Sequence, residues 1–477
     1  MMRKNMAGAC ALGVVLAGMA PMHAHGAVTD EDLTQIRQAI KKLEQQHAED
    51  AQHIKELEQR LKDSESRAVA AKDVAPKAQA GQTPISEIPV VTPSLPPDPQ
   101  PLLSSVATPV AMSAPAQTGA SASANAFNPA IGMTLMGTYS HFSHDPDTSP
   151  APGFTLGEDA GSLGTQGFSL GESEISLSAN IDQMFYGQLI LSYPGEGGVE
   201  VEEGFIQTTS LPWGVMAKGG RFFSGIGYLN EQHAHAWDFL DAPLPYRVML
   251  NNQLSDDGVQ VRWTAPINSF LQFGMEGLRG EKFPATPTHD GVGAQSVFVK
   301  AGGDVNESNS WLASLAYYHA DAEELMTGDD IFTGENHLGI AGLVWKWAPD
   351  GNFVERNLKL QSEFFFRRQE GIFNDLAYRG NQTGFYGQAI YQFMPRWSVG
   401  VRYDQLSAGD QGGDLAGTTL DNLGDTLQRY SSVLTYNTSE FGRFRLQYNY
   451  DDSAPQSNQG VMLNYTVSLG AHGAHQY

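Results

Sequence analysis

Hydrophobic and polar residues alternate along most of the chain from residue 127 onward. In VMLNYTVSL, which begins at Val461, valine, leucine and tyrosine occupy every second position, and asparagine, threonine and serine stand between them. A period of two places the two kinds of residue on opposite faces of a β-strand. About sixteen such segments follow one another, and each is close to the ~10 residues that a tilted strand needs to cross a bilayer.

The links between these segments alternate between short and long. The short links are at 181–182, 210–212, 266–267, 304–307, 349–351, 394–395 and 439–440. The long links are at 143–166, 224–256, 279–291, 321–336, 369–381 and 407–427, with one compact link on the same side at 194–198. A membrane barrel with tight turns at one end and large loops at the other predicts this rhythm.

A soluble β-sandwich would show the same alternation, because its apolar faces meet a second sheet. In this chain, however, Tyr, Trp and Phe gather at the ends of the apolar faces, where the aromatic girdles of membrane barrels lie. A closed barrel also leaves no unpaired strand edge in lipid. We therefore predict an all-β transmembrane barrel of about 16 antiparallel strands over residues 127–477.

The N-terminal quarter of the chain has a different composition. Residues 1–27 have basic residues, an apolar stretch and alanine-rich cleavage sites, which is the pattern of a secretory signal peptide. Residues 28–64 carry aliphatic residues in heptads and predict a short α-helical coiled coil. Residues 65–126, rich in Pro, Ala and Ser, predict a disordered linker. Because Cys10 is the only cysteine, the mature chain has no thiol chemistry.

Charge and motifs exclude several function classes. The net charge of -24 argues against nucleic acid as a partner. The sequence has no Gly-x-Ser-x-Gly elbow, and no cluster of His, Ser and carboxylate follows from spacing, so we predict that the protein is not an enzyme.

A barrel of sixteen strands is too wide for its own side chains to fill, so a water-filled lumen remains unless a segment plugs it. The alternation assigns polar and charged residues to the inner face, where they would select the solutes that pass. The predicted lumen charges are Glu172, Glu174, Lys300, Lys359, Glu363 and Arg367.

The strings FNPAIG at 127, GRFFSGIGYLNEQHAHAWDF at 220 and SLGAHGAH at 468 resemble those of a family of proteobacterial outer-membrane proteins. Members of that family are labelled as porins or as zinc-regulated, TonB-dependent receptors. The receptor label fits poorly, because receptors of that kind have a folded plug domain ahead of a larger barrel. The terminal aromatic residue, Tyr477, resembles the C-terminal signal that the barrel assembly machinery of Gram-negative bacteria recognises.

In strand count and loop order the chain also resembles sixteen-stranded general porins, whose third long loop folds inward and narrows the pore. The resemblance implies a homotrimer and places the loop at 224–256 in the lumen. We predict a constriction in which acids of this loop face bases of the late strands; the alternative is that the charges are merely solvated. The predicted constriction residues are Glu231, Asp238, Asp241, Arg402, Arg443 and Arg445.

Two histidines in the same loop suggest a metal site. His233 and His235 are two residues apart, so they would share a face if the segment were extended, and with a carboxylate they could bind zinc. The alternative is a solvated loop without metal. No other cofactor is predicted.

The patterns together predict a passive outer-membrane channel for small hydrophilic solutes or ions, with its N-terminal region in the periplasm. Its partners would be outer-membrane lipid and the barrel assembly machinery. A zinc uptake protein or receptor is the first alternative. The second is a membrane-anchored tether whose coiled coil contacts peptidoglycan or a periplasmic partner.

Overall fold

The computed structural model describes residues 129–147, 150–193, 198–286, 291–409, 413–424 and 426–470. The predicted signal peptide, coiled coil and linker, and the terminal residue Tyr477, lie outside the described residues. Among those that are described, no helix has the length and apolar character needed to cross a membrane.

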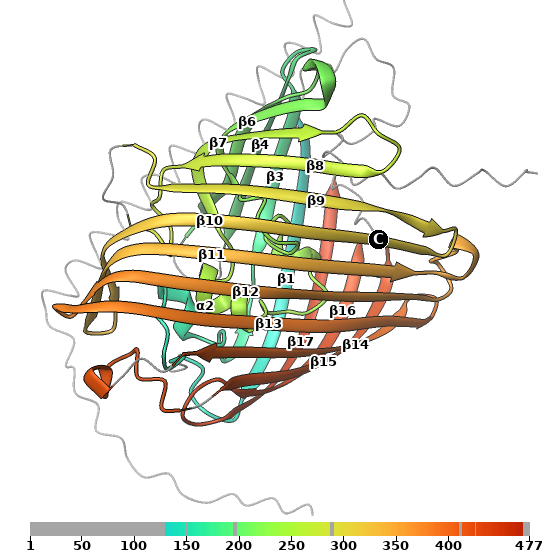
Figure 1. Cartoon of the computed structure of the whole chain (residues 1–477). Coiled ribbons are helices and arrows are strands. Elements are labelled where there is room, and N and C mark those ends of the chain that lie inside the picture. The colour runs from blue at the N-terminus through green and yellow to red at the C-terminus, as the bar shows by residue number, and fades with distance from the viewer. Residues whose placement is uncertain are drawn as a thin grey trace, which may run out of the picture. The chain divides into compact units, whose positions relative to one another are not determined.

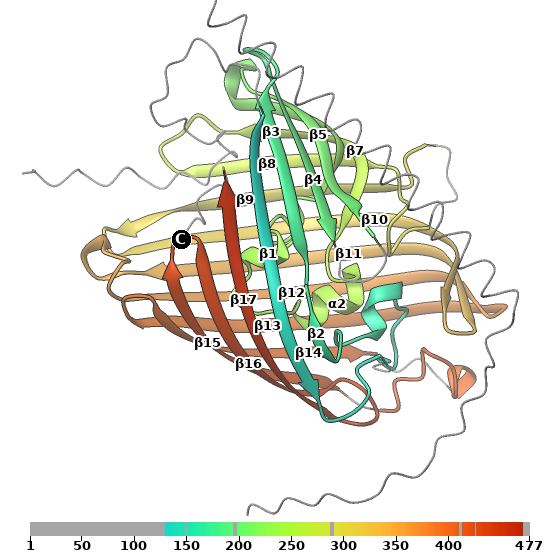
Figure 2. The ribbon, with the colours of Figure 1, turned by 180° about the vertical axis from the view of Figure 1, so that it is seen from behind.

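The described strands form a single antiparallel sheet that closes on itself (Figure 1). It has seventeen strand segments, but β2 and β3 both pair with β1 and form one interrupted strand, so the barrel has sixteen strands. Closure comes from β1, which pairs with β17 on one side and with β3 on the other (Figure 2). The predicted closed antiparallel barrel and its strand number are confirmed.

The strands of the first half are β1 (Ala130–Phe142), β2 (Gly167–Ser169), β3 (Ser173–Asn180), β4 (Phe185–Tyr193), β5 (Glu200–Thr208), β6 (Val215–Phe223), β7 (Ser255–Thr264), β8 (Phe270–Leu278) and β9 (Ala294–Asn306). Those of the second half are β10 (Asn309–Thr327), β11 (Asp330–Trp347), β12 (Asn357–Phe373), β13 (Leu376–Met394), β14 (Trp397–Ala408), β15 (Leu427–Ser439), β16 (Gly442–Asp452) and β17 (Asn458–Gly470). Helical elements are the α-helix α2 (Leu244–Leu250) and the 3-10 turns η1 (Glu158–Gly161), η2 (Pro212–Gly214), η3 (Ala234–Ala236), η4 (Pro349–Gly351) and η5 (Gly413–Leu415).

The outer face of the barrel is an apolar band between two sets of aromatic side chains. Its large hydrophobic residues are exposed on every second position of the strands, as lipid contact requires. Near the short turns, the rings of Trp397 and Tyr436 contact each other across β14 and β15, with centroids 4.6 Å apart. Near the long loops, Tyr403 lies 5.1 Å from Tyr430 on the same two strands.

The prediction of long loops at 321–336 and 369–381 is wrong. Strands β10 and β11 are joined by the two residues between Thr327 and Asp330, and strands β12 and β13 by the two residues between Phe373 and Leu376. These strands are 17 to 19 residues long, and they extend as hairpins past the apolar band (Figure 1).

Some apolar side chains of these extended hairpins face inward. Phe332, Phe373 and Tyr378 face inward, where they form an apolar cluster with Leu415 and Leu420 of the loop between β14 and β15. The outer face of these hairpins carries charged residues such as Asp321 and Glu335 as well as exposed apolar residues such as Met326 and Ile372.

The lumen contains a hydrophobic core that the alternation did not predict. Residues 224–254, which connect β6 to β7 and which we call the inserted segment, carry α2, and all seven residues of this helix are buried. The core includes apolar residues of the inserted segment, Phe154 of the first long loop, and Phe365 and Tyr386 of the wall. The lumen is therefore partly filled by chain segments and is not lined by polar residues alone.

Candidate functional site

The inserted segment leaves and rejoins the wall at one point. The Ser224 amide donates a hydrogen bond of 3.0 Å to the Leu254 carbonyl. The Asn230 side-chain amide donates to the Ser224 carbonyl and to the Leu254 carbonyl, each at 2.9 Å. Gly225 and Gly227 form the entry, and a Cβ on Gly227, whose φ is +72°, would lie 2.2 Å from the Tyr246 hydroxyl. The segment is thus a compact insert closed by its own hydrogen bonds.

Helix α2 forms inside the barrel for local reasons. Pro243 and Pro245 fix the backbone angles of its first turn, where the missing amide hydrogens are not needed. Asn251 adopts the left-handed conformation that ends helices, and the Asn252 amide donates to the Tyr246 carbonyl at 3.1 Å. The prolines and the Asn-Asn pair are signals that could have predicted this helix from the sequence.

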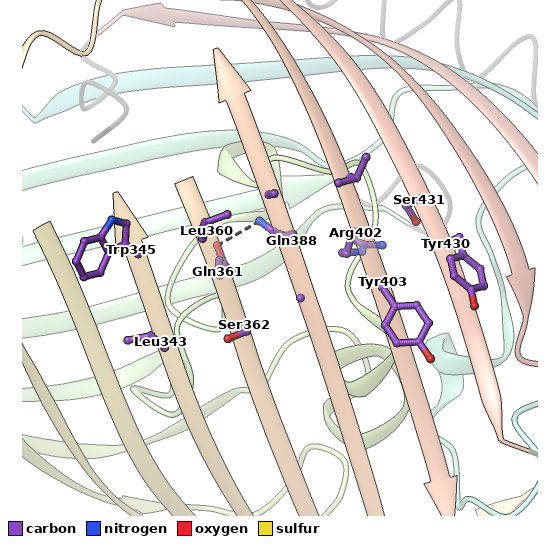
Figure 3. Close-up of a pocket in the computed structure, with 13 residues that line it drawn as sticks. Leu343, Trp345, Leu360, Gln361, Ser362, Gln388, Arg402, Tyr403, Tyr430 and Ser431 are labelled. Carbon is purple, nitrogen blue, oxygen red and sulfur yellow. Dashed lines mark hydrogen bonds between the residues drawn. The ribbon is translucent and has the colours of Figure 1, made fainter. Parts of the chain in front are cut away.

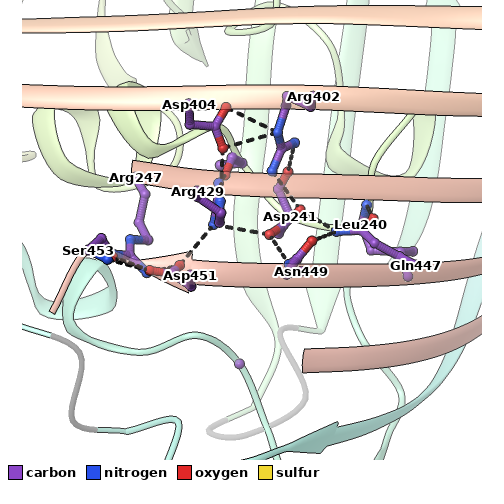
Figure 4. Close-up of polar contacts among 12 residues, drawn as sticks. Leu240, Asp241, Arg247, Arg402, Asp404, Arg429, Gln447, Asn449, Asp451 and Ser453 are labelled. Atoms are coloured by element: carbon purple, nitrogen blue, oxygen red, sulfur yellow. Dashed lines mark hydrogen bonds and ion pairs between the residues drawn. The ribbon is translucent and has the colours of Figure 1, made fainter. Parts of the chain in front are cut away.

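The Asp241 carboxylate joins the inserted segment to the inner wall of β14, β15 and β16 (Figure 4). It accepts from Arg402 at 2.9 Å and pairs with Arg429 at 3.1 Å, and both guanidinium groups also pair with the buried Asp404. Gln447 and Asn449 donate to the same carboxylate at 2.6 and 2.8 Å. We call Asp241, Arg402, Asp404 and Arg429 the latch.

Helix α2 connects to the same network through Arg247. The Arg247 guanidinium lies 3.8 Å from the Asp451 carboxylate, which is 3.7 Å from Arg429, and it donates to Ser453 at 2.9 Å (Figure 4). The helix and the latch are therefore parts of one buried ion-pair network between the inserted segment and the wall.

The other predicted acids of the loop are also paired with wall bases. Glu231 pairs with Arg262 of β7 and Lys300 of β9. Asp238 pairs with Lys359 of β12 at 2.5 Å and accepts from Gln388 at 2.8 Å. The structure thus places Glu231, Asp238 and Asp241 against basic side chains from three separate parts of the wall.

Arg443 and Arg445 contact the inserted segment differently from the prediction. Arg443 donates to the His235 carbonyl, and Arg445 donates to the Trp237 carbonyl at 2.9 Å. Arg445 is fully buried. Both arginines therefore donate to main-chain oxygens of the segment. Among the basic partners of the acids, Arg262 and Arg429 were not predicted.

Two predicted lumen charges are removed from water. Glu363 is 1% exposed and accepts hydrogen bonds from the hydroxyls of Tyr246 and Tyr386 and from the Tyr228 amide. Arg367 is fully buried beneath the ring of Phe154, at 5.6 Å from the ring centroid, and donates to Gln382. Both side chains position loop segments, so neither is an open lumen charge.

The pKa of Asp241 shows how strongly the latch holds its charge. Burial raises the pKa of this carboxyl, but Arg429 and Arg402 lower it more, so the pKa of Asp241 lies well below its ordinary value. A depressed pKa stabilises the folded state at every pH above the unfolded value of about 3.9, and this stabilisation is lost only as pH falls through the folded value.

We therefore expect the inserted segment to stay in place when the pH falls from 7 to 4. The measurement is hydrogen exchange of the amides of residues 236–250 in the full chain. Their protection, corrected for the intrinsic exchange rate, should be the same at both pH values and should fall only below pH 4. A loss of protection centred near pH 4 would mean that Asp241 titrates as an exposed carboxyl and is not held by the arginines.

A second cluster of charges lies where the inserted segment meets β3 and β5. The His235 Nδ1 atom is 2.7 Å from a Glu174 oxygen, and the His233 Nδ1 atom is 3.4 Å from the other oxygen. His233 also lies 3.3 Å from Glu202 and 3.2 Å from Glu203. Glu172 adjoins Glu202 and Glu174 in the same group.

The two imidazoles are brought together by a turn, not by the extended chain that the prediction assumed. Residues Ala234–Ala236 form the 3-10 turn η3, and the rings of His233 and His235 stack with centroids 5.6 Å apart. Burial would lower the pKa of His233, but the carboxylates of Glu174 and Glu202 outweigh it and raise this pKa well above its ordinary value. The cluster has more carboxylates than imidazoles, so it attracts cations.

Glu174, His233 and His235 have the donor atoms of a metal site. Each offers one nitrogen or oxygen, and these atoms lie within 4.8 Å of one another. Two imidazoles and one carboxylate form a known ligand set for zinc, which takes nitrogen and oxygen ligands in a tetrahedron. The residues present therefore fit a divalent transition-metal ion.

A groove also lies on the outer face of the wall, over strands β11 to β15 (Figure 3). It exists because Ser362, Gly387 and Ala389 are small among large apolar neighbours such as Leu360 and Val401. The groove belongs to the mainly apolar outer surface, and the inward-facing residues Gln361, Gln388 and Arg402 form its floor.

Comparisons with known proteins identify a relative and several barrels of similar fold. No family model matches the chain. An uncharacterized protein of Aquifex aeolicus (strain VF5) is 31% identical over 353 residues, which cover 67% of this chain and 72% of that protein.

Three solved structures illustrate the similarity of fold, and each match covers 72% of this chain. An anion-selective porin from Comamonas acidovorans has 11% identity and a TM-score of 0.48, with 99% of that chain covered. The OmpT loop L8 deletion mutant of Vibrio cholerae has 10% identity and a TM-score of 0.47, also with 99% covered. Salmonella typhi OmpF, in complex with daunomycin, has 12% identity and a TM-score of 0.45, with 97% covered.

Proposed function

Since the chain belongs to the same family as the uncharacterized Aquifex aeolicus protein, we propose its function from the geometry of the barrel: it is an outer-membrane channel for small hydrophilic solutes and ions, narrowed by the inserted segment. The observation that carries the proposal is the set of ion pairs between three acids of the segment and bases of the wall. A barrel of this width needs such an insert to become selective. No catalysis is expected.

The charges in the lumen are arranged as a filter. Carboxylates gather at the wall of β3 and β5, and basic side chains of β12 and β14 pair with acids of the inserted segment. Opposed rows of charge produce a field across the lumen that sorts solutes by charge and dipole.

A pair of lysines lies near one short turn in the second half of the barrel. Lys346 of β11 lies directly opposite Lys359 of β12, and both side chains are half-buried on the inner face. Lys359 is paired with Asp238 at 2.5 Å, so we assign the attraction of an anion in this region to the Lys346 ammonium. We infer that the channel prefers anions in this part of its path.

Reversal potentials of the purified full chain in a planar bilayer with a tenfold salt gradient test the channel and its preference together. We expect stepwise currents with anion preference, and the Lys346→Gln variant should shift the reversal potential toward cations. Lys282→Gln removes an exposed lysine from a loop and serves as the control, with no shift expected. Equal reversal potentials for all three proteins would show that Lys346 does not influence ion selectivity. Absence of current would contradict the proposal that the protein is a channel.

The cluster of Glu174, His233 and His235 supports a second function, which is binding of a divalent metal ion on its way through the lumen. His235 and Glu174 are both about 5% exposed and belong to different chain segments, so an ion bound there would join the inserted segment to β3. The metal would supply a charge that neutralises the surplus carboxylates. This function would make the barrel a metal uptake protein, and zinc is the ion that the ligand set favours.

The tether function depends on residues 28–126, which lie outside the described residues. Deletion of these residues separates the two functions, because a channel keeps its conductance without them whereas a tether loses its attachment.

A further inference from the structure

A second histidine pair lies on the outer face of the extended β10–β11 hairpin. His319 of β10 is directly opposite His337 of β11, and Asp321 is directly opposite Glu335 in the same register. Residues two apart on a strand share a face, so the four side chains form a square of two imidazoles and two carboxylates. The exposed fraction of the side chain is 28% for each histidine and 59% for Glu335.

The square lies on the outer face of the extended hairpin, next to charged residues of the neighbouring strand. Tyr317, two residues before His319, is exposed in the band of aromatic side chains that borders the lipid-facing surface. On the neighbouring strand β12, the outer face at the same height carries Arg368 and Glu370, which form an ion pair. The histidines are therefore accessible to ions in water and are separated by the wall from the luminal cluster.

The distances within the square suit a metal ion. The two Nδ1 atoms are 3.3 Å apart, and the ring centroids are 4.9 Å apart. In a tetrahedral site with bonds of ~2.0–2.1 Å, neighbouring ligand atoms are separated by about 3.4 Å. One donor atom from each of His319, Glu335 and His337 falls within 4.8 Å of the others, and an Asp321 oxygen lies 3.6 Å from the His319 Nε2 atom.

The hydrogen bonds indicate that at least one imidazole offers a lone pair. Two protonated Nδ1 atoms cannot face each other at 3.3 Å, because both would be donors. The Tyr317 hydroxyl lies 2.7 Å from the Nδ1 atom of His337, and a phenol that donates there leaves this nitrogen unprotonated. An unprotonated imidazole nitrogen is the form that binds metal.

The charges of the square also favour a cation. Asp321 and Glu335 are carboxylates on directly opposite positions, an arrangement that is destabilising without a positive group between them. Their nearest partners are the Nε2 atoms of His319 and His337, at 3.6 and 3.3 Å. Two carboxylates on one face, each beside an imidazole, therefore offer oxygen ligands to a cation.

We propose that His319, His337 and Glu335, with Asp321 beside them, form a site for a divalent transition-metal ion on the outer surface of the β10–β11 hairpin. Imidazole and carboxylate ligands suit Cu²⁺, Ni²⁺ and Zn²⁺ and disfavour Ca²⁺ and Mg²⁺, which take oxygen ligands. The site captures ions at the rim that carries the long loops, and it is independent of the luminal cluster.

The test is calorimetric titration of Ni²⁺ into the full chain in detergent, purified without a histidine tag. The background variant is His233→Gln with His235→Gln, so that the luminal cluster does not contribute. We expect one ion per chain. The further changes His319→Gln and His337→Gln should weaken its binding by at least ~100-fold, because loss of a residue that only hydrogen-bonds a metal ligand already costs ~10–100-fold. All four residues are on the surface, so the variants should fold, and heat-shifted migration on a gel verifies the barrel.

The matched control replaces His141 and His144, two exposed histidines near the same rim, with glutamine. Their loss should leave the affinity unchanged. If the His319→Gln, His337→Gln variant binds Ni²⁺ as tightly as the background protein, or if the control loses as much affinity, the proposed site is wrong.

Discussion

The substitution Asp241→Asn is expected to loosen the inserted segment from the wall. It leaves Arg402 and Arg429, which are 1% and 2% exposed, without the carboxylate that joins them to the segment. Removal of one partner from a buried ion pair costs about 3–5 kcal/mol. Because both arginines keep Asp404, we expect the lower end of this range, about 3 kcal/mol.

That free energy corresponds to roughly a 100-fold change in the equilibrium between the inserted segment bound to the wall and the segment released from it. Hydrogen exchange of residues 236–250 measures this equilibrium in the full chain, and their protection should fall by this factor. Single-channel recordings should show larger and noisier current, because the released segment no longer holds a fixed constriction.

The matched control is Asp257→Asn. Asp257 pairs with Arg221 at 2.8 Å on the exposed outer face of β7 and β6, and an exposed ion pair contributes only about 0–1 kcal/mol. Equal loss of protection in the two variants, or none in Asp241→Asn, would show that the latch does not hold the segment.

Loss of the two luminal histidines is expected to abolish tight metal binding in the lumen. The variant His233→Gln, His235→Gln removes both nitrogen donors and leaves Glu174 with weak oxygen ligands only. Loss of a residue that hydrogen-bonds a metal ligand already lowers metal affinity by ~10–100-fold. We therefore expect loss of two direct ligands to lower the affinity by more than ~100-fold. The measurement is Zn²⁺ titration of the full chain in which His319 and His337 are both glutamine.

The control for this prediction is again the pair His141 and His144, whose replacement should not alter Zn²⁺ affinity. A chain that binds Zn²⁺ equally well with and without His233 and His235 would exclude the luminal metal site. The channel function would stand in that case, because it depends on the ion pairs of the inserted segment rather than on the histidines.

The alternation of residues predicted the barrel well wherever one face meets lipid. A strand in the apolar band, such as β16 with Phe444, Leu446 and Tyr448 outward, shows a clean period of two. The prediction failed in the extended hairpins, because Asp, Glu and Gly on their outer face resemble loop residues. Their apolar residues also stand next to one another instead of alternating: Leu325 and Phe332 face inward, whereas Met326 and Ile331 face outward.

The site was predicted only in part, because residues that meet in it are far apart in the sequence. The resemblance to general porins predicted that the loop at 224–256 enters the lumen, and the structure places this loop against the inner wall, with His235 next to the Glu174 carboxylate. Glu174 is 61 residues from His235, and Arg429 is opposite Asp404 only through the register of β14 and β15. Such partners follow from strand pairing, which alternation alone does not specify.

The most direct measurement is the single-channel conductance of the wild-type chain and of a chain without the inserted segment, recorded in the same bilayers. Phe223 and Ser255 are directly paired across β6 and β7, so a two-residue Asn-Gly turn can replace residues 224–254. The account predicts small stepwise openings for the wild type and a conductance several times larger, with weaker ion preference, for the variant. Equal conductance in the two proteins, or no current in either, would contradict the claim that the inserted segment narrows a channel.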